Sequence, residues 1–187
     1  GAAVMPLRPA QPDGGGLADL LRYESDVRRQ ASVDELVYFV ANESRSLLGH
    51  DQMFVLRRTL LGEGFAVRNA SSLATIDRNA PLVQAIEKSA ERFGDITGPV
   101  EPELISDDPA IAEYPFHSWL WSPLKERDGS IFGGLLLART IPWTEADTVK
   151  ATRLNETIGH SWLALTGGKP VRRLARIDAK TRRWIAG

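Results

Sequence analysis

The chain contains no cysteine among its 187 residues. This absence excludes disulfides, thiol nucleophiles, zinc–thiolate sites and the thioether attachment of a cofactor. No apolar run reaches the length of about 18 residues that a transmembrane helix needs, and no secretory signal pattern is visible. We therefore expect a cytoplasmic protein.

The residues that usually carry catalysis or hold metals are few and scattered. The three histidines, at positions 50, 117 and 160, show neither HxH nor HxxxH spacing, so we predict no metal site. The acidic pairs between 101 and 108 are neighbours in one polar stretch and are expected to be solvated. Ser118 and Ser122 lack a His and Asp in the arrangement of a catalytic triad. We expect no enzymatic activity, no metal and no cofactor.

The near-zero net charge of -1 conceals a strong asymmetry. From Lys169 onward there are seven basic residues and one acid, which leaves 16 basic and 23 acidic residues before that point. The body is thus acidic and the C-terminal segment basic. Charge separated in this way indicates that the basic segment has a partner.

The apolar fraction of 43% and charged fraction of 25% are typical of a globular domain. Residues 1–16, rich in Pro, Gly and Ala, are predicted to be disordered. The pattern then predicts, in order, helices over 17–30 and 32–49, strands over 53–61 and 65–71, a helix over 79–92, an irregular stretch over 94–117, a hairpin over 118–138 and a helix over 144–165.

The segment from Ser118 to Asp147 has the strongest pattern. Trp119 and Trp121 share one face of the predicted strand, with Leu120 and Leu124 on the other. Residues 131–138 are almost continuously apolar, so both faces of that strand are predicted to be covered.

Single residues predict strand ends, turns and a helix start within the same segment. Pro123 cannot donate a backbone hydrogen bond, which places it at a strand edge, end or bulge. Asp128-Gly129 is a hairpin turn signal, and Gly133-Gly134 predicts a bulge or a close approach of another backbone or helix. Thr144 is a favourable N-cap for the helix that follows.

This strand–turn–strand–helix order, with these residues, resembles the C-terminal half of a GAF domain, and the likeness in element order extends over residues 17–166. The resemblance implies an α+β fold, with a GAF/PAS-like central antiparallel sheet and helices on its faces. It also implies a sensory or regulatory function, with a ligand pocket corresponding to residues 79–118. The residue pattern of cyclic-nucleotide-binding members is missing, and no cysteine is present to hold a bilin.

Candidate ligand-binding residues follow from this interpretation. The tryptophans are either a stacking floor for a flat ligand or core packing under a helix, and the arginines either line an anionic pocket or cover a solvent face. His117 either lies at the pocket mouth or is a loop histidine bonded to the backbone. The candidates are Phe116, His117, Trp119, Trp121, Arg57 and Arg68.

The terminal helices are the expected dimerisation elements. Apolar residues recur on both at helical spacing, so they form either the core or a seam between two parallel helices of a homodimer. The candidate seam residues are Leu17, Leu20, Leu21, Ile158, Trp162 and Leu165.

The basic segment 167–187 resembles the cytoplasmic flank of a membrane span. Its ending is similar to the segment before the anchor of hemolysin-secretion-type membrane fusion proteins. That likeness implies a domain tethered to the inner face of a membrane, as part of a secretion or efflux component. The alternatives are a plain solvated helix and a nucleic-acid-binding tail, but no nucleic-acid-binding motif is present and we expect no such partner. The candidate membrane-flank residues are Arg172, Arg173, Arg182, Arg183 and Trp184.

Two functions remain open. The first is a sensory domain that binds an unidentified small molecule and signals through its terminal helices. The second is a ligand-free domain that binds other proteins, in which Phe116, Trp119 and Trp121 fill the pocket region themselves. Side-chain volumes in a sequence do not reveal a void, so the sequence does not separate the two.

Overall fold

The computed structural model describes residues 13–61, 63–105 and 107–167. The elements are α1 (Asp13–Arg29), α2 (Val33–Glu43), α3 (Arg45–Leu48), β1 (Gln52–Arg58), β2 (Phe65–Ala70), α4 (Pro81–Phe93), α5 (Pro109–Ala112), β3 (Ser118–Lys125), β4 (Ile131–Arg139) and α6 (Glu145–Leu165).

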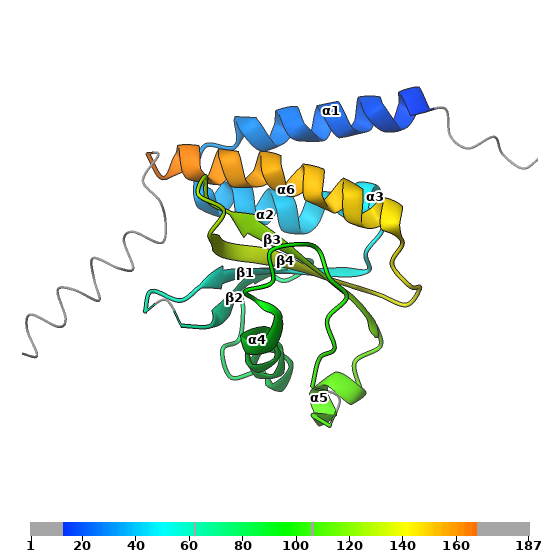
Figure 1. Cartoon of the computed structure of the whole chain (residues 1–187), viewed down its shortest axis with the longest axis vertical. Helices are drawn as coiled ribbons and strands as arrows, with labels where there is room; N and C mark the ends of the chain where they lie inside the picture. The colour runs from blue at the N-terminus through cyan, green and yellow to red at the C-terminus, as the bar shows by residue number, and fades with distance from the viewer. Residues whose placement is uncertain (1–12, 62, 106, 168–187) are drawn as a thin grey trace, which may run out of the picture.

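The strands form one antiparallel sheet in the order β2-β1-β4-β3. Helices α1, α2 and α6 lie on one face of the sheet, whereas α4 and α5 lie on the other (Figure 1). The predicted α+β class and the antiparallel sheet between helical layers are therefore confirmed.

Strand alternation gives each sheet face its own core. In β1, Met53 and Val55 pack toward the terminal helices, whereas Phe54 and Leu56 pack toward α4. In β3, the predicted division also holds, with Leu120 and Leu124 on the helical side and the two tryptophans on the α4 side. Every residue of β4 is buried, as expected of a central strand covered on both faces.

The hairpin of β3 and β4 follows the sequence prediction. Gly129 has φ +86°, a conformation that favours glycine, and the Glu126 N–H donates to the Ser130 carbonyl at 2.8 Å across the turn. Pro123 lies in β3, which is an edge strand. Its missing N–H therefore breaks no ladder in the middle of the sheet.

A buried arginine fixes the connection from β4 to α6. The Arg139 side chain donates to Asp147 Oδ2 at 2.6 Å and to the carbonyls of Ile141 and Pro142, and its guanidinium lies 3.7 Å from the centre of the Trp143 ring. Asp147 also completes a capping box with Thr144. Burial alone would raise the pKa of Asp147, but the hydrogen bonds from Thr144 and Arg139 outweigh it and lower the pKa.

Two predicted boundaries were wrong. Helix α1 begins at Asp13, so positions 13–16 of the segment expected to be disordered are helical, while residues 1–12 lie outside the described part. Extending an existing helix is far easier than nucleating one, which lets glycines join its first turn. The single helix expected over 32–49 is interrupted at Ser44, whose buried hydroxyl contacts Tyr23 and donates to the Val40 carbonyl at 2.6 Å.

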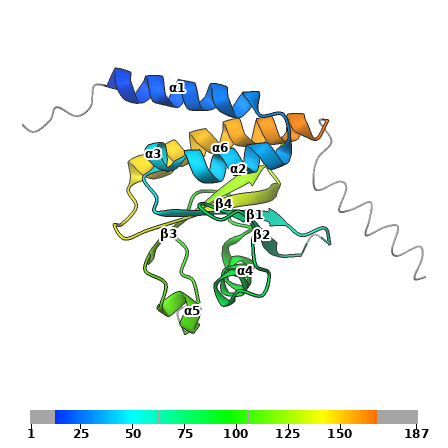
Figure 2. The ribbon, with the colours of Figure 1, turned by 180° about the vertical axis from the view of Figure 1, so that it is seen from behind.

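The predicted dimer seam was partly wrong. Ile158 and Trp162 are each 1% exposed, because α6 lies between the sheet and α1 (Figure 2). Phe132 meets the Trp162 ring edge-on at 5.4 Å. Leu20 and Leu165 are partly buried against the same core, so Leu17 and Leu21 are the candidate seam residues that stay exposed.

Replacing Trp162 with Ala is expected to destabilise the fold by about 3–5 kcal/mol, because it empties the centre of the helical-side core. Urea unfolding monitored by circular dichroism measures the loss. Val149→Ala, on the exposed side of α6, is the matched control and should change stability by less than about 0.5 kcal/mol. A Trp162→Ala protein as stable as wild type would contradict this core assignment.

His50 is a buried histidine, and neither of its ring nitrogens has a hydrogen-bond partner among the described residues. Burial is the main reason that its pKa falls to about 4, and the nearby Arg45 lowers it further. The folded state thus binds a proton less readily than the unfolded chain, whose histidine pKa is about 6.5. Above pH 6.5, His50 is neutral in both states and does not lower the free energy of unfolding. As the pH falls from 6.5 toward 4, the unfolded chain gains a proton that the folded state does not, so the free energy of unfolding decreases.

We therefore predict that His50→Phe removes part of the acid sensitivity of the fold. From pH 7 to pH 4 the wild type should lose about 3 kcal/mol more unfolding free energy than the variant, from about 1.4 kcal/mol per pKa unit. Urea unfolding of both proteins across this range measures the difference. Parallel pH profiles would show that His50 is not the group responsible.

Candidate functional site

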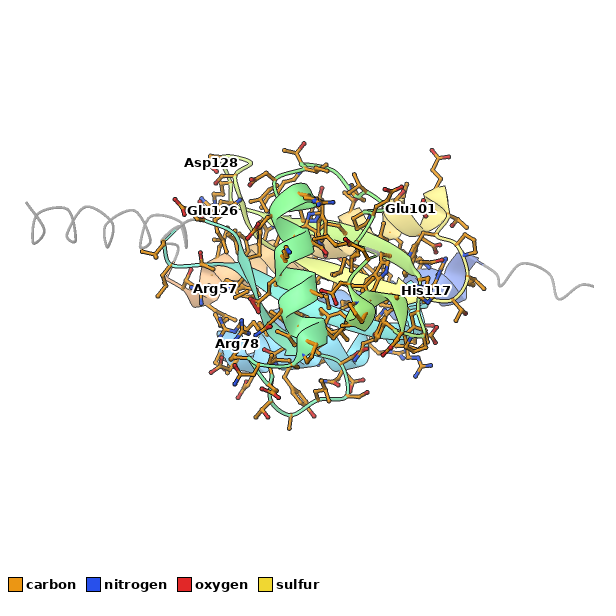
Figure 3. The ribbon with its side chains drawn as sticks, turned by 90° about the horizontal axis from the view of Figure 1, so that it is seen from below. Arg57, Arg78, Glu101, His117, Glu126 and Asp128 are labelled. Atoms are coloured by element: carbon orange, nitrogen blue, oxygen red, sulfur yellow. The ribbon has the colours of Figure 1, made fainter. Side chains whose placement is uncertain are left out.

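The α4 side of the sheet is where the resemblance places a ligand pocket. Trp121 is fully buried there, and its ring is met edge-on by Phe65 at 5.5 Å and by Phe93 at 5.2 Å. Phe65 comes from β2 and Phe93 from the last turn of α4, which runs across this face of the sheet (Figure 3). The indole therefore packs between the sheet and the helix, in the place predicted for a flat ligand.

A second aromatic group continues this packing. Tyr114 stacks on Trp119 with ring centres 5.3 Å apart, while Phe116 meets Tyr114 edge-on at 5.4 Å. Phe54 of β1 lies 6.3 Å from the Trp119 ring. The Tyr114 hydroxyl donates to Gln52 Oε1, and burial raises the pKa of Tyr114. Aromatic side chains of the chain itself thus occupy the surroundings of both tryptophans.

Glycine at position 134 makes the tight packing of Trp121 possible. A Cβ at this position would lie 2.2 Å from the nearest atom of the Trp121 ring, which is far inside van der Waals contact. A Cβ on Gly133 would lie 2.5 Å from the Leu56 carbonyl oxygen. The close approach that the Gly133-Gly134 pair predicted is therefore confirmed, with an indole at one glycine and a neighbouring strand at the other.

The irregular segment after α4 is anchored to the sheet. Val100 and Trp121 exchange two backbone hydrogen bonds of 3.0 and 2.8 Å, and the Ile105 N–H donates to the buried Ser89 hydroxyl. Asp108 caps the short helix α5 by accepting from the Ala110 N–H at 2.9 Å. These bonds hold the segment against β3 and α4, over the aromatic groups.

The six predicted ligand residues do not form one site. Phe116 is half-buried near Trp119, but His117 is exposed. Arg57 and Arg68 were wrongly assigned to this pocket, because the alternation of β1 and β2 turns them toward the terminal helices. The Arg68 guanidinium lies 5.6 Å from the centre of the Trp162 ring and pairs with Asp34 of α2. Figure 3 shows Arg57 and His117 at opposite ends of the molecule.

The two arginines line a hollow of about 570 Å³ beside the β1–β2 connection. Arg57 is half-buried, and none of the ion pairs formed among the described residues includes it. Burial lowers its pKa, and the charge of Arg68 lowers it further. Leu60, Leu61 and Ala66 give the hollow an apolar lining.

A smaller hollow of about 260 Å³ lies between β3 and α6. Asn155 of α6 is buried at its wall and donates through Nδ2 to the carbonyls of Ser122 and Pro123, at 2.7 and 3.1 Å. These bonds tie α6 to the edge strand at the proline. Sequence reasoning missed Asn155, although a polar residue directly after Leu154 in the apolar stripe of the helix was a usable signal.

Among the described residues, no group of three or more His, Asp or Glu side chains is placed to hold a metal ion. Within the same part of the chain, no helix combines the length and apolarity required to cross a bilayer.

Solved structures with a similar fold include GAF domains. The GAF domain of an Acinetobacter phosphoenolpyruvate-protein phosphotransferase has 14% identity and a TM-score of 0.59, covering 83% of this chain and 96% of that one. The photosensory core module of the Stigmatella aurantiaca phytochrome has 17% identity and a TM-score of 0.60, covering 93% and 41%. The free methionine-R-sulfoxide reductase of Neisseria meningitidis, solved with its substrate, has 19% identity and a TM-score of 0.56, covering 80% and 89%.

No protein-family model and no curated protein matches the sequence. The chain thus has a GAF-like fold, which confirms the fold expected from the hairpin. The three similar structures include a photosensor and a reductase, so this fold by itself does not define a function.

Gly134→Ala is expected to destabilise the protein by about 1–3 kcal/mol, since the new methyl group has to displace the Trp121 ring. Gly98→Ala is the matched control, because a Cβ there meets no atom within 4 Å. If the clash is the cause, the double variant Gly134→Ala with Trp121→Leu should lose less unfolding free energy than the sum of the losses in the two single variants. Additive losses in urea unfolding would contradict direct contact between these residues.

Proposed function

We propose that this chain is a non-catalytic, GAF-like regulatory domain that acts by binding other protein chains, with no small molecule held over Trp119 and Trp121. The observation that carries the proposal is the packing of Trp121 against Phe65, Phe93 and Gly134. A ligand at this position would have to displace a fully buried indole from a closely packed core.

The outer helical layer supplies the surface for such binding. The N-terminal half of α1 diverges from α6 in both views of the ribbon (Figures 1 and 2). Leu17 and Leu21 lie one turn apart on this half, and each is 52% exposed. We infer that a second copy of the chain covers them, forming a homodimer through paired α1 helices.

The second candidate is a sensor of an unidentified small molecule. It is favoured by the fold, because one of the similar structures is the photosensory module of a phytochrome. It is opposed by the aromatic packing around both tryptophans. Activity as an enzyme has less support. The chain has no cysteine to act as a thiol nucleophile, and the Ser122 hydroxyl accepts a hydrogen bond from Asn155.

The C-terminal segment completes the proposal. Its candidate membrane-flank residues, Arg172 to Trp184, lie outside the described residues, so their role rests on sequence alone. We propose that they tether the domain to the anionic inner face of a membrane, as expected for the cytoplasmic part of a secretion or efflux component.

Sedimentation of the full chain tests self-association, with the wild type compared to a double variant that combines Leu17→Glu and Leu21→Glu. The wild type should sediment as a dimer and the variant as a monomer, because the paired carboxylates repel across the seam. Circular dichroism should be the same for both, since neither leucine belongs to the core.

The matched control combines Tyr38→Glu with Val149→Glu, which adds the same charge at exposed positions of α2 and α6. This control should remain dimeric. A monomeric wild type, or a dimer that resists the leucine changes, would contradict the proposed seam.

A further inference from the structure

The buried amide of Asn155 has half of its hydrogen-bonding groups unused. Its Nδ2 group donates to the carbonyl and hydroxyl of Ser122 at 2.7 and 2.8 Å, and to the Pro123 carbonyl at 3.1 Å. Its Oδ1 atom has no partner among the described residues, and the residue is only 5% exposed. A buried carbonyl oxygen without a donor costs free energy, so Oδ1 is an acceptor for a molecule that supplies a donor.

Asn155 forms part of the wall of the hollow of about 260 Å³ between β3 and α6. On the helix, Thr152, Glu156 and His160 line it from successive turns of one face. The other walls are the end of β3 with the β3–β4 turn, which Glu126 and Asp128 mark in Figure 3, and the segment after α4. These walls contribute Thr97, Pro99, Lys125, Glu126 and Arg127. Most of the lining side chains are therefore polar or charged.

Charges of both signs reach this hollow without ion-pair partners. Lys125, Arg127 and Glu156 are exposed, and none of them belongs to an ion pair formed among the described residues. Glu126 differs, because it is buried and accepts a hydrogen bond from the Ser130 hydroxyl at 3.2 Å. The two cations come from β3 and its turn, whereas Glu156 comes from α6. Opposite charges thus stand on different walls of the hollow.

We propose that this hollow is a binding site for a small zwitterion, a molecule with one carboxylate and one ammonium group on a short skeleton. Its carboxylate binds Lys125 and Arg127 on the strand side. Its ammonium group has three N–H donors, so it can bind Glu156 and Asn155 Oδ1, which are neighbours on α6, at the same time. A simple anion would face the Glu156 carboxylate and the unpartnered Asn155 oxygen, and a simple cation would face Lys125 and Arg127.

The volume of the hollow suits a ligand of the size of a free amino acid. Pockets for drug-sized ligands measure about 300–1,000 Å³, and this hollow is slightly smaller. The charged side chains at its rim are exposed, so a ligand can enter and leave without a movement of the fold. We therefore expect an exchangeable effector, which is lost on dilution during purification, and not a resident cofactor. Neither Phe65 nor Phe93 lines the hollow, so this site is independent of the packing around Trp121.

NMR titration of the ¹⁵N-labelled full chain gives the direct test, because the Asn155 side-chain amide is itself a reporter group. The probes are the L-amino acids, first as a mixture at millimolar concentration and then singly. At least one of them should cause a saturable shift of the Asn155 Nδ2–H signals and of the backbone amides of Lys125 and Glu156. The matched control ligands are the N-acetyl and the carboxamide derivatives of the same amino acid. Each lacks one charge and should bind about tenfold more weakly.

Removal of the two charges from the protein gives the second test. The double variant Lys125→Gln with Glu156→Gln should bind the amino acid about tenfold more weakly than the wild type. The matched control is Lys88→Gln with Glu91→Gln, which removes the same charges from exposed positions of α4 and should bind like the wild type. All four positions are exposed, so circular dichroism should show that both variants are folded.

Other results would overturn the proposal in distinguishable ways. If no amino acid shifts these signals, the hollow holds water only. An equal response to the N-acetyl derivative would identify an anion site, and an equal response to the carboxamide would identify a cation site. Binding that is unchanged in the Lys125→Gln, Glu156→Gln variant would place the ligand elsewhere on the domain.

Discussion

The contact between Trp121 and Gly134 is the constraint on which the α4 side of the domain depends. A methyl group at position 134 would lie 2.2 Å from the indole, so glycine is what allows the ring to pack directly against β4. The same ring also packs against Phe65 and Phe93, at interplanar angles of 78° and 62°. One residue without a side chain in β4 therefore makes room for the indole that packs against Phe93 of α4.

The other sheet face follows a different principle. There α6 is buried between the sheet and α1, and Asn155 and Arg139 fix its position through hydrogen bonds to the edge strand and to the helix cap. The apolar stripe of α6 is thereby buried in the core, whereas Leu17 and Leu21 on the diverging half of α1 remain exposed. One face of the sheet thus carries a closed aromatic core, and the other carries helices of which α1 is the outermost. This arrangement supports a domain that binds partners through its surface.

Sequence reasoning predicted the β3–β4 hairpin well, because Pro123 and Gly129 constrain the backbone locally and the alternation around Trp119 defines the two faces of the strand. It failed at Ser44, where a buried hydroxyl and a contact with Tyr23 end a helix that local propensity would continue. It also misplaced Arg57 and Arg68, whose side of the sheet depends on strand register. It left Ile158 and Trp162 open between core and dimer seam, because their burial depends on where α1 packs. Those properties are set by tertiary contacts that no local pattern contains.

The central claim is that aromatic side chains of the chain itself occupy the place where a ligand would be expected. Native mass spectrometry of the full chain, purified from its own host under conditions that retain bound small molecules, tests it most directly. The expected masses equal one or two polypeptides and nothing more. A stoichiometric additional mass that is lost on denaturation, and that is absent from a Trp121→Leu variant, would contradict it and identify the domain as a sensor.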